Sequence, residues 1–290
     1  MIYLILSVLS SVIIFVVFKI FSKYNVNTFH AIVVNYLVAC ASGVTAYENS
    51  IKVTEISSYE WFYLSLALGS LFIIVFNLMA LTTQRSGLSV VSVATKMSVV
   101  IPIIFGLVYY KESFGAIKIA GVFLALIAVY LSSTKTKDGL TVSRKDFIFP
   151  LLVFIGSGII DTSLKFLENS FVAENDVPLF SATIFGAAAC IGIIVIIFQA
   201  IKGDFSFQLK NIVGGIVLGI PNYFSIYFLV KALRSDLLDS SGIFTINNVA
   251  VVMVSTFFGI LFFKEKLSTS NWFGMFLAVI SIFLVTLAGF

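Results

Sequence analysis

Three ionisable residues lie inside long apolar segments, where a charge is costly and usually has a function. Lys96 lies in the apolar run 88–110, and Asp161 and Lys165 lie in the run 147–167. At the centre of a bilayer a charged side chain costs about 2.5–3.5 kcal/mol on insertion scales, so such residues normally face a water-filled cavity or a partner. Lys96 lies three residues before the middle of its run, within roughly 5 Å of the midplane. It can bind a carboxylate or phosphate as a cation, or carry a proton; a structural pairing between helices is the alternative.

Asp161 and Lys165 are four residues apart with the acid first, which is the favourable order for an ion pair within one helix. Such a pair can simply neutralise itself. Asp161 can instead contact a substrate, or meet Lys96 through water, whereas Lys165 is the better candidate for a residue at the membrane interface. Both residues therefore remain candidates for substrate binding or coupling.

Amide and aromatic side chains supply further candidates for a polar site inside the membrane. Asn247 and Asn248 are adjacent in the run 241–263 and offer both hydrogen-bond donors and acceptors, which the orientation of a polar solute requires. Asn77, Asn222 and Tyr223 are candidates for the same lining, and Asn35 and Gln84 are weaker ones. Hydrogen bonding between helices is the alternative role for these amides.

The run 211–231 contains Gly214, Gly215, Gly219 and Pro221. Glycines allow close helix approach, and a proline removes one backbone hydrogen bond, so we expect a bend in this segment. Bent or broken helices near a repeat interface often mark binding sites, although packing alone explains most glycines in such helices.

The residues that enzymes and metal sites need are sparse. The single histidine, His30, lies near the end of an apolar run, and the two cysteines, Cys40 and Cys190, lie far apart inside others. The sequence shows no metal-ligand spacing, nucleophile elbow or phosphate-binding glycine loop. We therefore predict no catalytic residues, no metal site and no cofactor.

The segments that carry these residues are transmembrane helices. Apolar residues make up 60% of the chain and charged residues 11%, and the mean hydropathy is +1.10. A helix needs about 20 apolar residues to cross the hydrocarbon core. Ten such runs are present, which we place at 2–21, 29–47, 61–82, 88–110, 115–132, 147–167, 178–201, 211–231, 241–263 and 269–289. They are continuously apolar, which excludes the alternating pattern of a transmembrane β-barrel.

The charges of the connecting segments bear on orientation. Eleven Lys and Arg residues would lie on one face of the membrane and both termini on the other. The positive-inside rule therefore predicts that both termini lie outside.

The chain also contains an internal repeat. A shift of 153 residues aligns 105–131 with 258–284, and ten of the 27 aligned residues are identical, including Lys111-Glu112 with Lys264-Glu265. The same shift places Asn247 and Asn248 opposite Ala94 and Thr95, beside Lys96. Two halves of five helices each must enter the membrane in opposite senses, and such inverted repeats are typical of secondary transporters. We expect one five-helix domain at 1–134 and a second at 147–290.

The two aligned segments, 105–131 and 258–284, which end the two halves, resemble the EamA-type ten-helix members of the drug/metabolite transporter superfamily. The Lys-Glu pairs take the place of that family's signature before helices 5 and 10, and Leu78–Lys111 resembles its helix 3 to helix 4 turn with a proline, here Pro102, inside helix 4. The second half has Ser255 at that position. The resemblance implies an all-α fold with a central cavity lined by helices 1–4 and 6–9. It also implies cytoplasmic termini, in conflict with the charge count, so orientation stays open.

We interpret the chain as a secondary transporter, and not an enzyme, in the cell membrane. It would move a small organic metabolite, such as an amino acid, a sugar or a drug-like solute, by alternating access, with export as the expected direction. A membrane receptor or assembly subunit that binds a solute without moving it is the main alternative, and a lipid-modifying membrane enzyme is the third. The expected partners are the solute and the bilayer, with no nucleic acid; a homodimer is one possible assembly. Neither the substrate nor the coupling ion can be read from one sequence.

Overall fold

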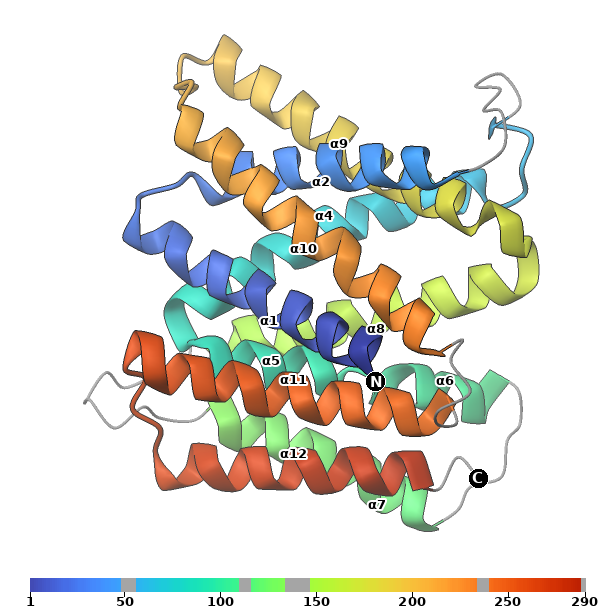
Figure 1. Cartoon of the computed structure of the whole chain (residues 1–290), viewed down its shortest axis with the longest axis vertical. Coiled ribbons are helices and arrows are strands. Elements are labelled where there is room, and N and C mark those ends of the chain that lie inside the picture. The colour runs from blue at the N-terminus through green and yellow to red at the C-terminus, as the bar shows by residue number, and fades with distance from the viewer. Residues whose placement is uncertain (48–55, 110–115, 134–146, 234–239, 288–290) are drawn as a thin grey trace. The chain divides into compact units, whose positions relative to one another are not determined.

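All regular elements of the described residues are helices. The computed structural model describes residues 1–47, 56–109, 116–133, 147–233 and 240–287. The α-helices are α1 (Ile2–Lys23), α2 (Thr28–Ala46), α4 (Phe62–Ser86), α5 (Leu88–Met97), α6 (Val100–Tyr109), α7 (Ala116–Ser133), α8 (Ile148–Phe171), α9 (Val177–Ile201), α10 (Leu209–Leu233), α11 (Ser240–Phe263) and α12 (Thr269–Leu287). A short 3₁₀ helix, Glu174–Asp176, precedes α9 (Figure 1).

These helices have the length and composition of membrane spans. Among the described residues, six helical segments, in α1, α2, α4, α9, α10 and α11, are long and apolar enough to cross a bilayer. Four shorter apolar segments accompany them, at Leu88–Pro102, Ile119–Ser132, Ile148–Leu164 and Thr269–Leu284. Each of the ten coincides with one of the ten spans predicted from the sequence, so the all-α membrane fold is confirmed.

The chain forms two compact units, and each contains helices from both sequence repeats. The first unit comprises Met1–Lys19, Leu78–Ile159 and Phe224–Phe290, and the second comprises Ile20–Asn77 and Ile160–Tyr223. Helices α1, α4, α8 and α10 contribute residues to both units. The units are therefore a different division of the chain from the predicted domains 1–134 and 147–290, which stay a prediction.

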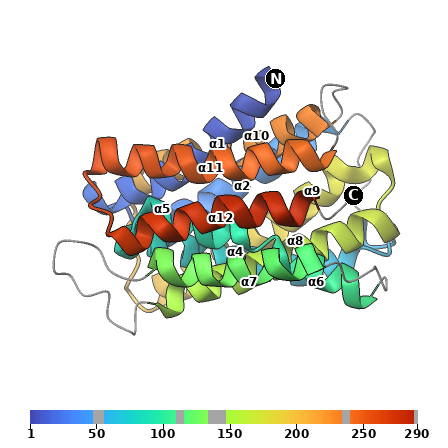
Figure 2. The ribbon, with the colours of Figure 1, turned by 90° about the horizontal axis from the view of Figure 1, so that it is seen from below.

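In the first unit, α7 and α12 form the most extensive helix pair, and α5 packs on α11 (Figures 1 and 2). At Gly274 of α12 an added Cβ would lie 2.6 Å from the backbone nitrogen of Ser132 in α7, so the two backbones are in close contact. The Asn271 side chain donates to the Ser132 carbonyl over 2.6 Å. Small residues and buried amides join membrane helices in this way, because the lipid supplies no hydrophobic force between them.

In the second unit, α2 pairs with α9 in the same manner. An added Cβ at Gly43 of α2 would lie 3.0 Å from the Cβ of Ala182, and one at Gly69 of α4 would lie 2.7 Å from that of Ala187. The Tyr36 hydroxyl, which is buried, donates to the Phe72 carbonyl over 2.8 Å. Helix α9 thus packs closely on α2 and α4 through small side chains.

The helices that pair most extensively are those that the sequence repeat relates. Ala116 and Thr269, the first residues of α7 and α12, are 153 positions apart (269 − 116), the shift of the repeat. Helices α2 and α9, and α5 and α11, occupy corresponding places in the two halves. When two repeats are related by a rotation axis that runs between them, a helix near the axis packs on its own counterpart in the other repeat.

The fourth predicted span, 88–110, is wrong as a single continuous helix. It consists of α5 and α6, separated at Ser98 and Val99. Pro102 explains the break, because a proline donates no backbone hydrogen bond and its ring clashes with the carbonyl four residues earlier, which is that of Ser98. That carbonyl instead accepts from the backbone nitrogen of Ile101 over 2.9 Å, in a tight turn.

Pro221, the proline in the interior of α10, leaves its helix intact. Pro221 lies inside α10, which runs from Leu209 to Leu233 as one helix. Gly215 and Gly219 of α10 let its backbone approach α2; an added Cβ at Gly219 would lie 2.7 Å from the Cβ of Val38. Neighbouring helices help a membrane helix to tolerate a proline.

Candidate functional site

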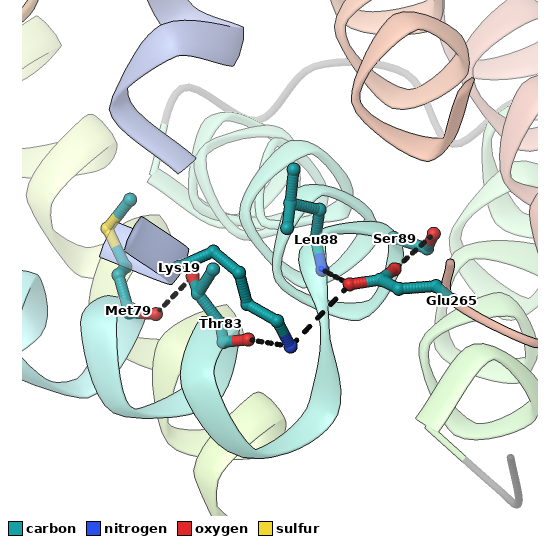
Figure 3. Close-up of polar contacts among 6 residues, drawn as sticks. All are labelled: Lys19, Met79, Thr83, Leu88, Ser89 and Glu265. Atoms are coloured by element: carbon teal, nitrogen blue, oxygen red, sulfur yellow. Dashed lines mark hydrogen bonds and ion pairs between the residues drawn. The ribbon is translucent and has the colours of Figure 1, made fainter. Parts of the chain in front are cut away.

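The carboxylate of Glu265 lies at the N-terminus of α5 and replaces the missing helix cap. Its Oε1 accepts from the backbone nitrogen of Leu88 over 2.8 Å, and its Oε2 accepts from the Ser89 hydroxyl over 3.3 Å (Figure 3). The N-cap residue of α5, Gly87, has no side chain to do this. Because the first backbone N–H groups of a helix lack partners and carry partial positive charge, a carboxylate is the favoured group there.

Two glycines make room for this carboxylate. Gly87 has φ +101°, a backbone conformation that L side chains rarely adopt, and a Cβ there would lie 2.7 Å from Oε1 of Glu265. A Cβ at Gly259 in α11 would lie 2.5 Å from Oε2. The backbone nitrogen of Glu265 also donates to the Gly259 carbonyl over 3.0 Å, which turns the chain back after α11.

Lys19, near the end of α1, completes the cluster. Its ammonium lies 3.7 Å from Oε1 of Glu265 and donates to the carbonyl of Thr83 in α4 over 3.2 Å. The side chain of Glu265 is 10% exposed and that of Lys19 is 24% exposed. Figure 3 shows both side chains directed to the turn between α4 and α5. This Lys19–Glu265 cluster therefore joins α1, α4, α5 and the α11–α12 connection, all within the first unit.

Sequence reasoning did not predict the Lys19–Glu265 cluster as a site. It identified Lys264-Glu265 only as a signature of resemblance, and included Lys19 only among the eleven Lys and Arg residues counted for orientation. The signal that was available is Gly87 between two helical runs, since a glycine at a helix start without a capping side chain leaves the cap to another segment. Lys111 and Glu112, the equivalent pair of the first half, lie outside the described residues.

Lys96 lies at the other end of α5, in the last turn of this ten-residue helix, and is half-buried. The break after α5 places the carbonyl end of a helix beside Lys96, and a cation is stabilised by the partial negative charge there. Lys96 thus lies at the end of a half-helix, and its depth near the membrane midplane stays a prediction. Such termini within the membrane bind charged solutes or ions in transporters.

Asn247 and Asn248 are both buried in α11, which packs on α5. The Ser7 hydroxyl of α1 lies 3.3 Å from Oδ1 of Asn247 and 2.9 Å from the carbonyl of Ser225. A hydroxyl donates a single proton, so these two contacts are alternatives. The first unit therefore brings Lys96 and the two amides onto a pair of adjacent helices.

In the second unit, a buried amide pair links α2 and α10. The side-chain nitrogen of Asn222 donates to Oδ1 of Asn35 over 3.1 Å. The side-chain nitrogen of Asn35, fully buried, has no hydrogen-bond partner within the described part of the chain. Tyr223 is half-buried beside this pair in sequence. The hydrogen bond of Asn222 is therefore a contact between helices. It leaves the side-chain nitrogen of Asn35 without a partner among the described residues.

The other predicted residues of the second unit are more dispersed. Asn77, half-buried in α4, donates to the Ile73 carbonyl of its own helix over 2.7 Å, a structural bond. Asp161 is exposed in α8. Lys165 belongs to the same helix, but its side chain lies outside the described residues. Lys96 and Asp161 belong to different units, so a site that joins them stays a prediction.

Metal ligands do not cluster in the described ranges: no group of three or more His, Cys, Asp or Glu side chains is close enough there to hold an ion. The single histidine donates from its Nε2 to Oε1 of Gln199 over 3.0 Å. That contact joins α2 to α9 in the second unit.

Comparison with known proteins identifies the family. Residues 1–134 match the sequence model of the EamA-like transporter family. An uncharacterized protein of Haemophilus influenzae is 32% identical over 288 residues, covering 97% of this chain and 96% of that protein. The chain belongs to the EamA-like transporter family. The resemblance carried by the Lys-Glu pairs and Pro102 is thus confirmed, and with it membership of the drug/metabolite transporter superfamily and a multi-pass membrane location.

A solved structure supports the fold of this EamA-like protein. The crystal structure of a protein only 14% identical superposes with a TM-score of 0.60, over 97% of this chain and 96% of that one. At this identity the likeness concerns the fold and not the solute. The roles of the site residues in this EamA-like protein therefore depend on the geometry described above.

Proposed function

We propose that this EamA-like protein is a secondary transporter of the cell membrane that exports a small polar or amphipathic organic solute by alternating access. The observation that carries the proposal is the packing of repeat-related helices on each other, α7 on α12, α5 on α11 and α2 on α9. Two like halves that pack about a common axis can exchange conformations, which converts a cavity open to one side into a cavity open to the other.

Within the proposal, Lys96 contacts the solute or carries the coupled proton. It ends a half-helix, and Asn247 and Asn248 lie on the neighbouring helix, so a cation and two amides of suitable chemistry for a carboxylate or phosphate belong to adjacent helices. Asp161, Lys165, Asn77, Asn222 and Tyr223 are secondary candidates for contact with the solute. The proposal includes no enzyme activity and no bound cofactor, and its partners are the solute and the bilayer.

The first experiment identifies the solute. The purified protein is screened with a metabolite library for thermal stabilisation, because a solute at 100 times its dissociation constant adds about 2.7 kcal/mol to the free energy of unfolding. A stabilising solute is then tested for flux in proteoliposomes. A solute that stabilises the protein but does not cross the membrane would contradict transport and favour a receptor or assembly subunit.

The second experiment tests Lys96. We expect Lys96→Met to lower flux roughly 10- to 100-fold, since hydrogen bonds to charged groups contribute about 1.5–3 kcal/mol and each 1.4 kcal/mol is tenfold. Lys23→Met, which changes an exposed lysine at the end of α1, is the matched control and should transport normally. Normal flux in a folded Lys96→Met protein would refute the role assigned to Lys96.

A further inference from the structure

The groups that the Lys19 ammonium contacts keep other partners when it moves away. Glu265 retains its hydrogen bonds from the Leu88 nitrogen and the Ser89 hydroxyl (Figure 3). The carbonyl of Thr83 also accepts from the backbone nitrogen of Gly87 over 3.1 Å. Lys19 itself is 24% exposed, so water can hydrate its ammonium. Separation of the ion pair therefore leaves none of these hydrogen-bonding groups unpaired.

The two partners of the ion pair are held with different strength. Glu265 follows Lys264, whose φ of +52° is uncommon for a residue with a side chain and turns the chain so that the carboxylate reaches α5. The Lys19 ammonium lies 3.7 Å from Oε1 of Glu265, beyond the roughly 2.7–2.9 Å of a charge-assisted hydrogen bond. It ends a flexible four-carbon stem. Glu265 is therefore the fixed partner and Lys19 the movable one.

The ion pair lies where it can link the movement of α1 to the position of α5. Lys19 is the last residue of α1 that belongs to the first unit, and α1 continues into the second unit from Ile20. Helix α5 has ten residues and is about 15 Å long. Glu265 caps its first turn, and Lys96 lies in its last turn. One short helix thus has the ion pair at its start and the residue proposed to contact the solute at its end.

We propose that Lys19 and Glu265 form a gating ion pair, closed in the conformation described above and open in the other conformation of the transport cycle. This inference rests on the proposed function, because alternating access requires two conformations that exchange. Opening moves Lys19 away from the α4–α5 turn and admits water there. Since partly exposed ion pairs contribute little net free energy, loss of the pair shifts the balance between two folded conformations and does not unfold the protein.

Ser86, the last residue of α4, provides a reporter for the opening of the α4–α5 turn. Its side chain is 9% exposed, and its hydroxyl has no hydrogen-bond partner among the described residues. Ser86→Cys therefore introduces a thiol at this turn without removing a hydrogen bond. The chain has two cysteines, so Cys40→Ser and Cys190→Ser leave this thiol as the sole one. A water-soluble maleimide then reacts faster the more often the turn is open.

The test compares maleimide labelling rates of purified proteins that all carry these three substitutions. We expect Lys19→Met to label roughly fivefold faster than the parent, the upper end of the effect of a partly exposed ion pair. Lys19→Arg keeps the charge and should label like the parent. Lys23→Met is the matched control, because it removes an exposed lysine one turn further along α1, and it should also label like the parent.

A double-mutant cycle tests whether the two charges act as a pair. Glu265→Gln keeps an acceptor for the Leu88 nitrogen and removes the charge that attracts Lys19, so it should label as fast as Lys19→Met. The double variant Lys19→Met/Glu265→Gln should label no faster than either single variant, since residues that act through one interaction are not additive. Additive rates would overturn the proposal.

Two further results would also overturn it. Equal labelling of Lys19→Met and the parent would show that the pair does not control the turn. A thermal unfolding midpoint of Lys19→Met as low as that of Glu265→Ala would show that the pair maintains the fold and does not select a conformation. If Lys19→Met does not fold, Glu265→Gln is held to the same expectations. Labelling needs no solute, so failure of the gating pair appears in these rates, whereas failure of transport appears only in the flux assay.

Discussion

The fourth helix of the first repeat and its counterpart in the second repeat show how one residue makes two like halves different. The segment 88–109 is broken into α5 and α6, whereas α11 runs unbroken from Ser240 to Phe263. Pro102 stands in the first and Ser255 at the aligned position of the second. The Ser255 hydroxyl donates to the Val252 carbonyl over 3.0 Å within an intact helix.

The two halves therefore place different chemical groups in corresponding helices. The broken helix presents a carbonyl terminus and a lysine, Lys96, within an apolar segment. The intact helix presents neutral amides, Asn247 and Asn248, on a regular backbone. Discontinuous membrane helices concentrate ligand-binding groups at their ends. We therefore expect changes to the first half to alter function more, and changes to the second half to alter stability more.

The largest expected effect comes from a proline in the intact helix. Ser255→Pro would remove a backbone hydrogen bond in the interior of α11 and should cost about 3 kcal/mol or more of stability. Thermal unfolding in detergent measures the loss.

Ser255→Ala is the matched control for this variant, since it removes the hydroxyl and keeps the backbone donor. It should unfold close to the parent. If Ser255→Pro unfolded at the same temperature as Ser255→Ala, α11 would not depend on its continuity and the contrast between the halves would fail.

A smaller effect is expected at the other end of the broken helix. Glu265→Ala removes the cap of α5, worth typically about 1 kcal/mol, and leaves the Leu88 nitrogen without its partner, for a total of about 2 kcal/mol. Glu265→Gln keeps an acceptor for that nitrogen and loses the charge near Lys19, so it should fall between the parent and Glu265→Ala. The midpoint of thermal unfolding orders the three proteins.

Glu60→Ala serves as the control, because Glu60 is an exposed carboxylate and exposed changes usually stay within about 0.5 kcal/mol. An equal midpoint for Glu265→Ala and Glu60→Ala would show that the carboxylate does not stabilise α5.

The sequence predicted the helices well and the site only in part. Runs of apolar residues specify membrane spans because the hydrocarbon core has a fixed thickness. The aligned pairs, Lys111-Glu112 and Lys264-Glu265, indicated two like halves. The partner of Glu265 could not be predicted, because capping of α5 brings together residues that are 177 positions apart. Pairing between Asn35 and Asn222 depends in the same way on how α2 packs against α10.

The break at Ser98 was missed for a different reason. Pro102 was recognised, yet prolines inside membrane helices have two outcomes, and Pro221 shows the other one in α10. Local sequence does not choose between them, since neighbouring helices can satisfy the freed backbone groups or leave the helix divided.

The smallest effect on stability, and the sharpest test of the comparison, is expected for Pro102→Ala. The new backbone N–H at 102 can donate to the Ser98 carbonyl and restore a continuous helix, with a net change within about 1 kcal/mol. Hydrogen exchange at residues 97–103 should slow, and flux should fall because Lys96 no longer ends a half-helix.

Close packing of α8 on α6 is the other cause of the break that this variant tests. An added Cβ at Gly158 in α8 would collide with Ile101 of α6. If the break persists in Pro102→Ala, this tight contact is the remaining cause, and the difference between the halves would then originate in packing and not in the proline.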